Sequence, residues 1–434
     1  MTPREICLQL LISTERGQEY SNIALDKALK KYHDLKPIDR RFISALYYGV
    51  LERKLTLDAI IGARSTRPSD KLSIDLRQIL RMGIYQILYM DAVPESAAVN
   101  ESVKLARGLK NPSAAGFVNA LLRGFLRDGS KIPKTGVKLK DLSIEYSIPE
   151  WIVELWTRDY GEQTALALLS QTLGSAPMTV KLNTCTHQLD AILDELSAQG
   201  VEAEKVPSPA PDCYTITNCG SVEALTAYQK GMLHVQDLSC QLCCLELDAK
   251  PNDIVLDLCS APGGKAFTIA EYMNDSGKIY AYDLHKNRVR LITSGAERLG
   301  LKSIVAAENN AKIFSDSIPQ ADRILCDVPC SGLGVIRRKP EIKYRAEEDD
   351  TALTATQYAI LTTSAKYLKV GGTLIYSTCT LRRSENDDIV DRFLKENPDF
   401  EPVKLTNFTD FKQTITPYLY GSDGFFIAKM TRKR

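Results

Sequence analysis

The chain has 434 residues, of which 44% are hydrophobic and 25% are charged, and its formal net charge at pH 7 is +1. These are ordinary globular values, so the composition excludes a disordered or fibrous chain, and the length predicts about three domains. No window of about 18 apolar residues occurs and no signal peptide is recognisable, so we expect a soluble, cytoplasmic protein. The eleven cysteines are scattered and odd in number, which favours reduced thiols over a disulfide framework.

Residues 1–130 are predicted to form an all-α bundle. Apolar residues recur there at spacings of three and four, short breakers separate the segments, and Asp39 is expected to cap one helix. This part carries 20 Lys and Arg against 14 Asp and Glu, so it is the end of the chain expected to bind phosphates, although a solvated helical surface explains the same surplus. Gly, Ser and Pro follow, and residues 131–141 are predicted as a linker.

A small α+β domain is predicted for residues 142–219. Helical and strand patterns alternate in it at residues 151–156, 162–173, 178–183, 189–196 and 213–217. Trp151 and Trp156 could stack on bases, but at this spacing tryptophans more often anchor a core, which is the favoured interpretation.

From residue 220 to the end, strands alternate with helices. Strands are predicted at residues 254–258, 278–283, 303–307, 323–327, 373–378 and 424–430, with helices notably at 286–299 and 352–369. This alternation predicts an α/β fold with a mostly parallel, doubly wound, Rossmann-like sheet. Ligands of such sheets bind at the carboxyl ends of the strands.

A glycine-containing loop, DLCSAPGGK at residues 257–265, follows the first of these strands and opens a helix. It is not a P-loop, because Cys259 stands where a glycine is needed and Ala266 stands where Ser or Thr is needed, and it is not GxGxxG. What remains is a tight turn that lets a ligand approach the backbone at a helix N-terminus. Asp283 ends the next strand, where a carboxylate typically binds ribose hydroxyls. A nucleoside cofactor without a pyrophosphate suits both features, and S-adenosyl-L-methionine is the obvious one.

Two further motifs place a cysteine after a strand: Cys330 in DVPCSG and Cys379 in STCT. Their Pro, Ser, Gly and Thr neighbours are not typical of a core, so two thiols at one rim of a sheet suggest covalent chemistry. Cytosine C5 becomes nucleophilic once a thiolate adds to C6, and a second polar group helps the product to leave. Cys240 and Cys243 also form a CxxC, but no second ligand cluster accompanies it, so we expect these thiols to pack in a helix and expect no metal.

The motifs DLCSAPGGK, DVPCSGLGVIRRKPEIK and YSTCTLRRSEN together resemble those of the 5-methylcytosine RNA methyltransferases. The helical N-terminus resembles the NusB-like RNA-binding domain, and the combination resembles the RsmB (Sun/Fmu) family, which methylates bacterial 16S ribosomal RNA. The resemblance covers nearly the whole chain. It implies a methyltransferase domain at residues 220–434, an RNA-recognition subdomain at 142–219 and RNA binding by residues 1–130.

The resemblance also implies individual roles. Cys379 is the expected nucleophile, Cys330 the thiol that assists elimination and product release, and Asp327 a residue near the cofactor amino group and the target ring. Asp283 is expected at the ribose, and Asn310 stands where the family commonly has an Asp that meets the adenine, so this contact is expected to be weaker. The loop around the methionine end of the cofactor is expected to consist of Cys259, Ser260, Ala261, Pro262, Gly263, Gly264 and Lys265.

The expected reaction methylates C5 of one cytosine of 16S ribosomal RNA, before or during assembly of the small subunit, through a covalent Cys–C6 adduct on a flipped base. Basic residues after the first cysteine motif are expected either to grip phosphates or to form a solvated loop: Arg337, Arg338, Lys339 and Lys343. Two alternatives stay open: the same chemistry on transfer RNA or another RNA site, and a non-catalytic RNA-binding assembly factor. The oligomeric state also stays open, with a monomer favoured and no membrane partner expected.

Overall fold

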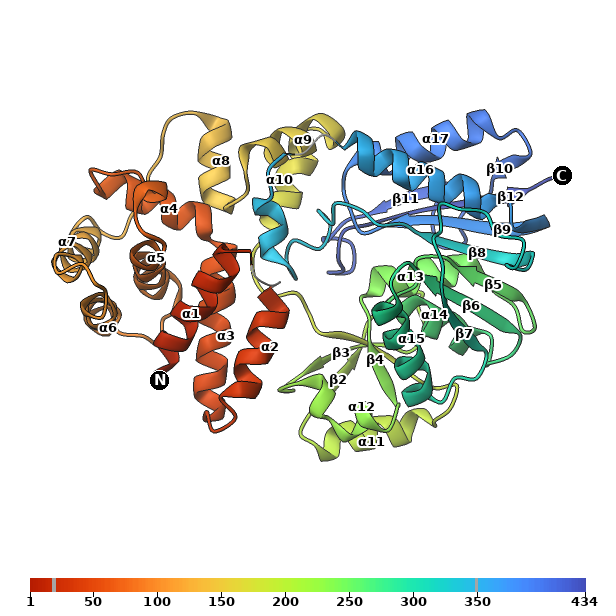
Figure 1. Ribbon diagram of the computed structural model, residues 1–434, viewed down its shortest axis with the longest axis horizontal. Helices are drawn as coiled ribbons and strands as arrows, with labels where there is room; N and C mark the ends of the chain where they lie inside the picture. The colour runs from red at the N-terminus through yellow and green to blue at the C-terminus, as the bar shows by residue number, and fades with distance from the viewer. Residues whose placement is uncertain (18–20, 348–349) are drawn as a thin grey trace. The chain divides into compact units, whose positions relative to one another are not determined.

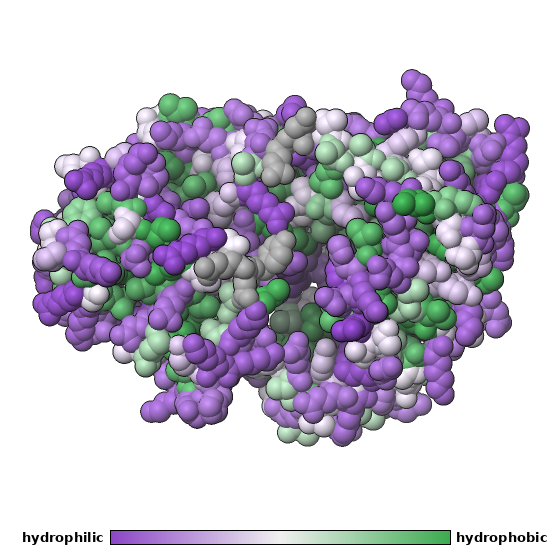
Figure 2. Space-filling model, in the orientation of Figure 1, coloured by the Kyte–Doolittle hydropathy of each residue, from purple (hydrophilic) through white to green (hydrophobic). Residues whose placement is uncertain are grey.

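The computed structural model describes residues 1–17, 21–347 and 350–434, and its contacts divide the chain into two compact units (Figure 1). Unit 1 comprises Met1–Gly174 and Ile336–Glu347, and unit 2 comprises Ser175–Val335 and Glu348–Arg434. Within the described ranges, no helix is long and apolar enough to cross a membrane. Hydrophilic residues cover most of the face shown in Figure 2, and hydrophobic ones are scattered among them.

Unit 1 is helical, which confirms the predicted all-α bundle at the N-terminus. Its helices are α1 Pro3–Glu15, α2 Ser21–Lys31, α3 Pro37–Glu52, α4 Lys54–Arg64, α5 Ile74–Tyr89, α6 Glu95–Arg107, α7 Ala114–Arg127, α8 Lys138–Tyr146, α9 Glu150–Tyr160 and α10 Glu162–Ser170, with 3-10 turns η1 Ser69–Lys71 and η3 Pro340–Tyr344. Helix α8 begins inside the predicted linker 131–141. Trp156 is 1% exposed and lies in the core, as favoured from its spacing.

The predicted helix cap at Asp39 is wrong. Helix α3 begins two residues earlier, with Lys36 as its N-cap and Pro37 as its first residue, so Asp39 lies in the first turn. A proline ring fixes φ near its helical value and has no N–H that would remain unpaired. Proline is therefore favoured as the first residue of a helix.

Unit 2 contains a small antiparallel sheet in the order β2-β3-β1-β4. Its elements are β1 Thr179–Leu182, α11 Leu189–Ala198, β2 Glu202–Lys205, β3 Cys213–Thr217, η2 Val222–Ala224, α12 Thr226–Gln229 and β4 Leu233–Val235. The sequence did not predict β2 or β4, since β2 is a mostly exposed, charged strand and β4 has three residues.

The larger sheet of unit 2 confirms the predicted mostly parallel α/β fold. Its strands run in the order β10-β12-β9-β8-β5-β6-β7, and β11 pairs with β12. The neighbouring strands β9, β8, β5, β6 and β7 are all parallel, whereas β12 is antiparallel to β9. The elements are α13 Leu238–Leu247, β5 Ile254–Asp257, α14 Gly264–Tyr272, β6 Lys278–Asp283, α15 Lys286–Leu299, β7 Ile304–Glu308, β8 Ala321–Asp327, α16 Thr351–Ala365, β9 Leu368–Thr378, η4 Arg383–Glu385, α17 Asp387–Glu396, β10 Phe400–Pro402, β11 Lys412–Ile415 and β12 Phe425–Arg432.

Helices cover both faces of this sheet: α13, α14 and α15 share one hydrophobic core with it, and α16 and α17 share the other (Figure 1). Strand β5 lies between β6, which follows it in the chain, and β8, which comes later. The strand order therefore reverses between β5 and β8. In open α/β sheets, ligands bind outside the carboxyl ends of the strands at such a switch point.

Candidate active site

Cys330 and Cys379 follow the neighbouring parallel strands β8 and β9, and their Sγ atoms lie 3.2 Å apart. The structure thus brings the two predicted thiols together. The hydrogen bond with the Cys379 sulfur, together with burial, raises the pKa of Cys330 well above its usual value. The protonated form of Cys330 is therefore favoured, and the contact between the two sulfurs is short enough for a thiol–sulfur hydrogen bond.

The loops that carry the two thiols are joined to each other. Gly334 N–H donates to the carbonyl of Cys379 at 3.0 Å, and the hydroxyls of Ser331 and Thr380 lie 2.7 Å apart. A Cβ at Gly334 would stand 2.0 Å from the carbonyl oxygen of Gly424, so only glycine allows this approach. The spacing of the thiols is thus set by backbone contacts as well as by the strands.

Asp327 lies at the end of β8, next to the switch point, and forms an ion pair with Lys265 at 2.8 Å. The Ser377 hydroxyl donates to its other oxygen at 2.9 Å. Burial alone would lower the pKa of Lys265, but the Asp327 carboxylate more than offsets it and holds that pKa well above its usual value. Lys265 therefore stays charged and holds the Asp327 carboxylate in place. The ion pair joins the end of the cofactor loop to the start of the first cysteine motif.

The predicted cofactor loop makes the tight turn that its glycines require. Gly263 has φ +108°, and a Cβ there would stand 2.4 Å from the ring of Phe267. Its N–H donates to the carbonyl of Ser260 at 2.8 Å, and Ser260 N–H donates to Tyr282 of β6 at 2.7 Å. Burial raises the pKa of Cys259 well above its usual value, which disfavours the thiolate form of this third thiol.

Asp257, at the end of β5, is a buried carboxyl group. The Ser260 hydroxyl and the Cys259 N–H lie close enough to act on its pKa, but among the described residues neither its oxygens nor the Ser260 hydroxyl has a hydrogen bond of good geometry. Burial raises the pKa of Asp257 to about 7. A cationic ammonium group of a ligand would satisfy these acceptors, so the loop fits the amino-acid end of S-adenosyl-L-methionine.

Asp283 and Asn310 lie at the ends of the neighbouring strands β6 and β7. Asp283 accepts from His285 N–H at 3.2 Å and pairs with Arg288 at 3.1 Å, and Arg288 also donates to the carbonyl of Ala261 in the cofactor loop at 2.7 Å. Sequence reasoning missed Arg288; its signal is an arginine in the first turns of the helix that follows Asp283. The Asn310 side-chain oxygen accepts from Lys312 N–H at 3.1 Å, which folds the turn after β7.

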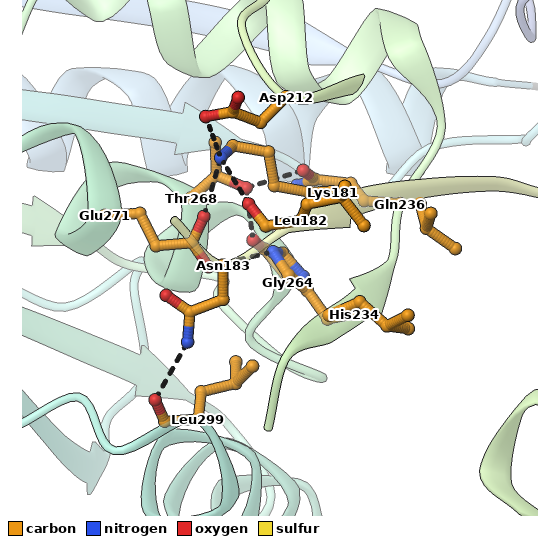
Figure 3. Close-up of polar contacts among 12 residues, drawn as sticks. Lys181, Leu182, Asn183, Asp212, His234, Gln236, Gly264, Thr268, Glu271 and Leu299 are labelled. Carbon is orange, nitrogen blue, oxygen red and sulfur yellow. Dashed lines mark hydrogen bonds and ion pairs between the residues drawn. The ribbon is translucent and has the colours of Figure 1, made fainter. Parts of the chain in front are cut away.

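The small sheet contacts the helix that follows the cofactor loop, as Figure 3 shows. Lys181 of β1 is 1% exposed and pairs with Glu271 of α14 at 3.0 Å and with Asp212 at 3.5 Å. Thr268 of α14 donates to the side chain of Gln236 at 2.6 Å. The middle and the last turn of α14 are therefore held from the side of the small sheet, through Thr268 and Glu271.

The prediction that Lys343 grips phosphates is wrong. This side chain is fully buried in unit 1, and its ammonium donates to the carbonyl of Glu52 at 2.8 Å, as does the hydroxyl of Tyr344 at 3.0 Å. Ser21 donates to Glu341 through its N–H at 3.1 Å and its hydroxyl at 2.8 Å. The segment after the first cysteine motif therefore packs among helices α2 to α4 instead of lying in solvent.

A hollow of about 750 Å³ lies between α6 and α7 of unit 1. Both walls carry exposed cations, Lys104 and Arg107 on α6 and Arg123 on α7. Lys104 pairs with Glu101, and Arg123 donates to Asn119 at 2.8 Å. The surplus of positive charge makes this groove a candidate for contacting phosphates.

Comparison with known proteins gives consistent matches along the chain. Residues 1–127 match the NusB family, residues 148–223 match a domain described as Methyltr_RsmF/B-like, ferredoxin-like, and residues 244–431 match the family described as 16S rRNA methyltransferase RsmB/F. The probable ribosomal RNA small subunit methyltransferase B of Bacillus subtilis is 38% identical, over 99% of this chain and 98% of that protein. Its namesake in Synechocystis is 34% identical over 100% of both chains.

Solved structures agree on the fold. The crystal structure of PH0851 has a TM-score of 0.83 and 25% identity, over 100% of this chain and 99% of that chain. NSun6 from Pyrococcus horikoshii, crystallised with SFG, has a TM-score of 0.60 and 22% identity, over 66% of this chain and 98% of that chain.

Proposed function

Because the chain belongs to the ribosomal RNA small subunit methyltransferase B (RsmB) family, it is an RNA methyltransferase, and we propose that it methylates C5 of one cytosine in 16S ribosomal RNA. The observation that carries the choice of C5 is the pair of sulfurs 3.2 Å apart at the end of adjacent strands. Methylation at a nucleophilic oxygen or nitrogen has no need of a thiol, whereas C5 requires activation by addition at C6.

In the proposed mechanism the two thiols have different roles. The thiolate of Cys379 adds to C6 of a flipped cytosine, which forms the C–S bond and places an electron pair at C5. After methylation, the C5 proton leaves to a base; its electron pair restores the C5–C6 double bond, and Cys379 departs as a thiolate. Cys330, a neutral thiol beside that sulfur, donates a hydrogen bond that stabilises the departing charge.

S-adenosyl-L-methionine supplies an electrophilic sulfonium methyl group when it is bound. We place its amino-acid end at the loop 259–265, where the side chains of Asp257 and Ser260 lack hydrogen bonds of good geometry. Asp283 is placed at the ribose, held in orientation by Arg288, and Asn310 at the adenine. Asp327, paired with Lys265, is placed between this end of the cofactor and the target ring.

The RNA is proposed to contact unit 1 as well as the active site. The match of residues 1–127 to the NusB family and the cationic groove between α6 and α7 support this placement. Cationic side chains bind phosphates without reading sequence, so this contact would position the RNA. The names of the relatives and the description of the matching family support 16S ribosomal RNA as the substrate. We propose that the reaction takes place in the cytoplasm, before or during assembly of the small subunit.

Two thiol variants test the mechanism. Cys379→Ser should abolish methyl transfer and form no covalent protein–RNA complex, because a serine alkoxide is not available at neutral pH. Cys330→Ala should accumulate that complex, which denaturing electrophoresis separates from free protein. A Cys379→Ser enzyme with normal turnover would overturn the proposal.

Bisulfite mapping of small-subunit RNA tests the substrate. Cells with the protein should show one protected cytosine that is unprotected in cells without it. Protection that changes in transfer RNA, with none in 16S ribosomal RNA, would establish the alternative substrate and contradict the ribosomal one.

A further inference from the structure

Glu385 and Asn386 are adjacent, fully buried polar residues at the end of the YSTCTLRRSEN motif. They follow Cys379 by six and seven residues and lie where η4 passes into α17. Neither belongs to the thiol pair or to the cofactor loop. Their hydrogen bonds nevertheless end on the immediate neighbours of the two thiols.

Asn386 holds both sides of Cys379. Its side-chain oxygen accepts from the Thr378 hydroxyl at 2.5 Å, and its side-chain nitrogen donates to the carbonyl of Thr380 at 3.0 Å. Thr378 and Thr380 are the residues before and after Cys379, and both are fully buried. One amide therefore fixes the loop on either side of this sulfur.

Glu385 holds both sides of Cys330, with the help of Gln357 on α16. Its Oε2 accepts from Ser331 N–H at 2.9 Å and from the Gln357 side chain at 2.8 Å. The same nitrogen of Gln357 donates to the carbonyl of Pro329 at 2.9 Å. Pro329 and Ser331 are the residues before and after Cys330, and both Glu385 and Gln357 are fully buried.

We propose that Glu385 and Asn386 are positioning residues that fix the two sulfurs relative to each other. Asn386 acts through the loop of Cys379, and Glu385 acts through the loop of Cys330. This inference rests on the proposed function. The two side chains are consecutive in one chain segment, so a single backbone position fixes both loops. Proton transfer and departure of a thiolate depend on sub-ångström placement, which buried hydrogen bonds on both flanks can provide.

Because the two residues hold different loops, their loss should impair different steps of the reaction. Glu385→Ala should leave adduct formation by Cys379 close to the wild-type rate but slow release about tenfold or more, so that the covalent protein–RNA complex accumulates as it does in Cys330→Ala. Asn386→Ala should instead slow adduct formation about tenfold or more. The full-length protein, a transcript of 16S ribosomal RNA and S-adenosyl-L-methionine are used, with single-turnover formation and multiple-turnover release measured separately.

Three further variants separate positioning from general destabilisation. Gln357→Ala should reproduce the accumulation seen with Glu385→Ala, because it removes the other support of the Cys330 loop. Glu385→Gln should restore release, since one amide oxygen can accept the same two hydrogen bonds. Thr356→Ala, beside Gln357 on α16 and bonded to Ala352 within the helix, is the matched control and should behave as wild type.

The inference fails if Glu385→Ala slows formation and release equally, if it changes neither, or if Glu385→Gln does not restore release. Cys330→Ala, measured in parallel, distinguishes this failure from failure of the proposed function. If Cys330→Ala traps the complex and Glu385→Ala does not, only the positioning role is wrong. If Cys330→Ala traps nothing, the assignment of the thiols is wrong.

Discussion

Cys330 and Cys379 stand in equivalent sequence contexts, each after a parallel strand, and the structure brings their sulfurs to 3.2 Å from each other. Hydrogen bonding to Cys379 and burial raise the pKa of Cys330 well above its usual value. A thiol that stays protonated is a poor nucleophile and a useful hydrogen-bond donor. The raised pKa of Cys330 therefore agrees with the role of protonated thiol that the family resemblance implies for this residue.

Asp257 provides a pH-dependent prediction. Its pKa is raised to about 7 in the folded protein by burial, so the ionised form that would attract an ammonium group is lost below that pH. We expect the Kd for S-adenosyl-L-methionine to weaken by up to about tenfold per pH unit as the pH falls below 7. Isothermal titration between about pH 5 and 7 measures this, since the amino group of the ligand stays mostly charged in that range.

Asp257→Asn is the matched variant for this measurement, because it keeps the shape and removes the titrating group. Its affinity should be weaker than that of the wild type above pH 7 and should not change with pH. The free wild-type protein should also lose stability as the pH rises from about 4 to about 7, because the folded state binds the proton more tightly than the unfolded state. A pH profile that is identical in the variant would contradict the role given to Asp257.

Residue types and spacing predicted much of the candidate site but not its supports. Cys330, Cys379 and the loop 259–265 were predicted because each stands at the end of a strand, where topology brings side chains together, and Asp327 was expected from the family resemblance. Gln357 and Glu385 were missed because nothing in their local pattern distinguishes them from surface residues, and the position of Arg288 in the first turn of a helix is only a weak signal. Their partners come from segments 27 to 54 residues away, and only the fold reveals these contacts.

At the scale of elements, the buried ion pair between Lys181 and Glu271 joins β1 to the helix that follows the cofactor loop. Lys181→Met should destabilise unit 2 by about 3–5 kcal/mol, because it leaves the Glu271 carboxylate buried without its cation. It should also weaken binding of S-adenosyl-L-methionine, since the last turn of α14, the helix that follows the cofactor loop, loses a lateral support. Thermal unfolding and calorimetric titration measure the two effects.

The double variant Lys181→Met with Glu271→Gln is the control for that prediction. Removing both charges removes the penalty of an unpaired buried carboxylate, so most of the lost stability should return. If the double variant is as unstable as Lys181→Met alone, the ion pair is not the source of the loss.

Lys343 tests how η3 is held in the helical unit. Burial lowers its pKa from 10.5 to about 7, so between these values the unfolded state binds more protons than the folded state. Stability of wild type relative to Lys343→Met should therefore rise as the pH increases from about 7 to 10, with a slope of up to about 1.4 kcal/mol per unit. Hydrogen exchange of the backbone amides of α3 measures it locally. A difference that does not change with pH would show that Lys343 is not buried as a titrating group.

The fold was predictable wherever long segments carry a clear period. The helices of unit 1 and the parallel strands of the larger sheet have such segments, whereas β10 and β11 have three and four residues and no alternating pattern. Helix α16 was predicted to reach residue 369 but ends at Ala365, because β9 begins at Leu368 and its pairing with β8 takes over the chain. Tertiary pairing, not local propensity, sets such boundaries.

At the scale of the whole molecule, the family and the cationic groove between α6 and α7 together predict that RNA is bound in two places with different chemistry. The groove should contribute affinity through phosphates, and the sheet should contribute the reaction. A charge change in the groove should therefore raise the KM for long RNA and leave kcat unchanged. The adduct trapped by Cys330→Ala should still form.

Arg107→Glu with Arg123→Glu tests this expectation. Loss of two phosphate contacts should reduce the slope of log Kd against log salt by about 1.4 for single-stranded RNA, and affinity should fall most at low salt. Lys36→Glu with Arg41→Glu makes the same change of net charge at two exposed positions, the N-cap and the first turns of α3, that do not line the groove, and should lower affinity much less. Equal losses in the two double variants would show that net charge alone attracts the RNA, and would remove the groove as a specific contact.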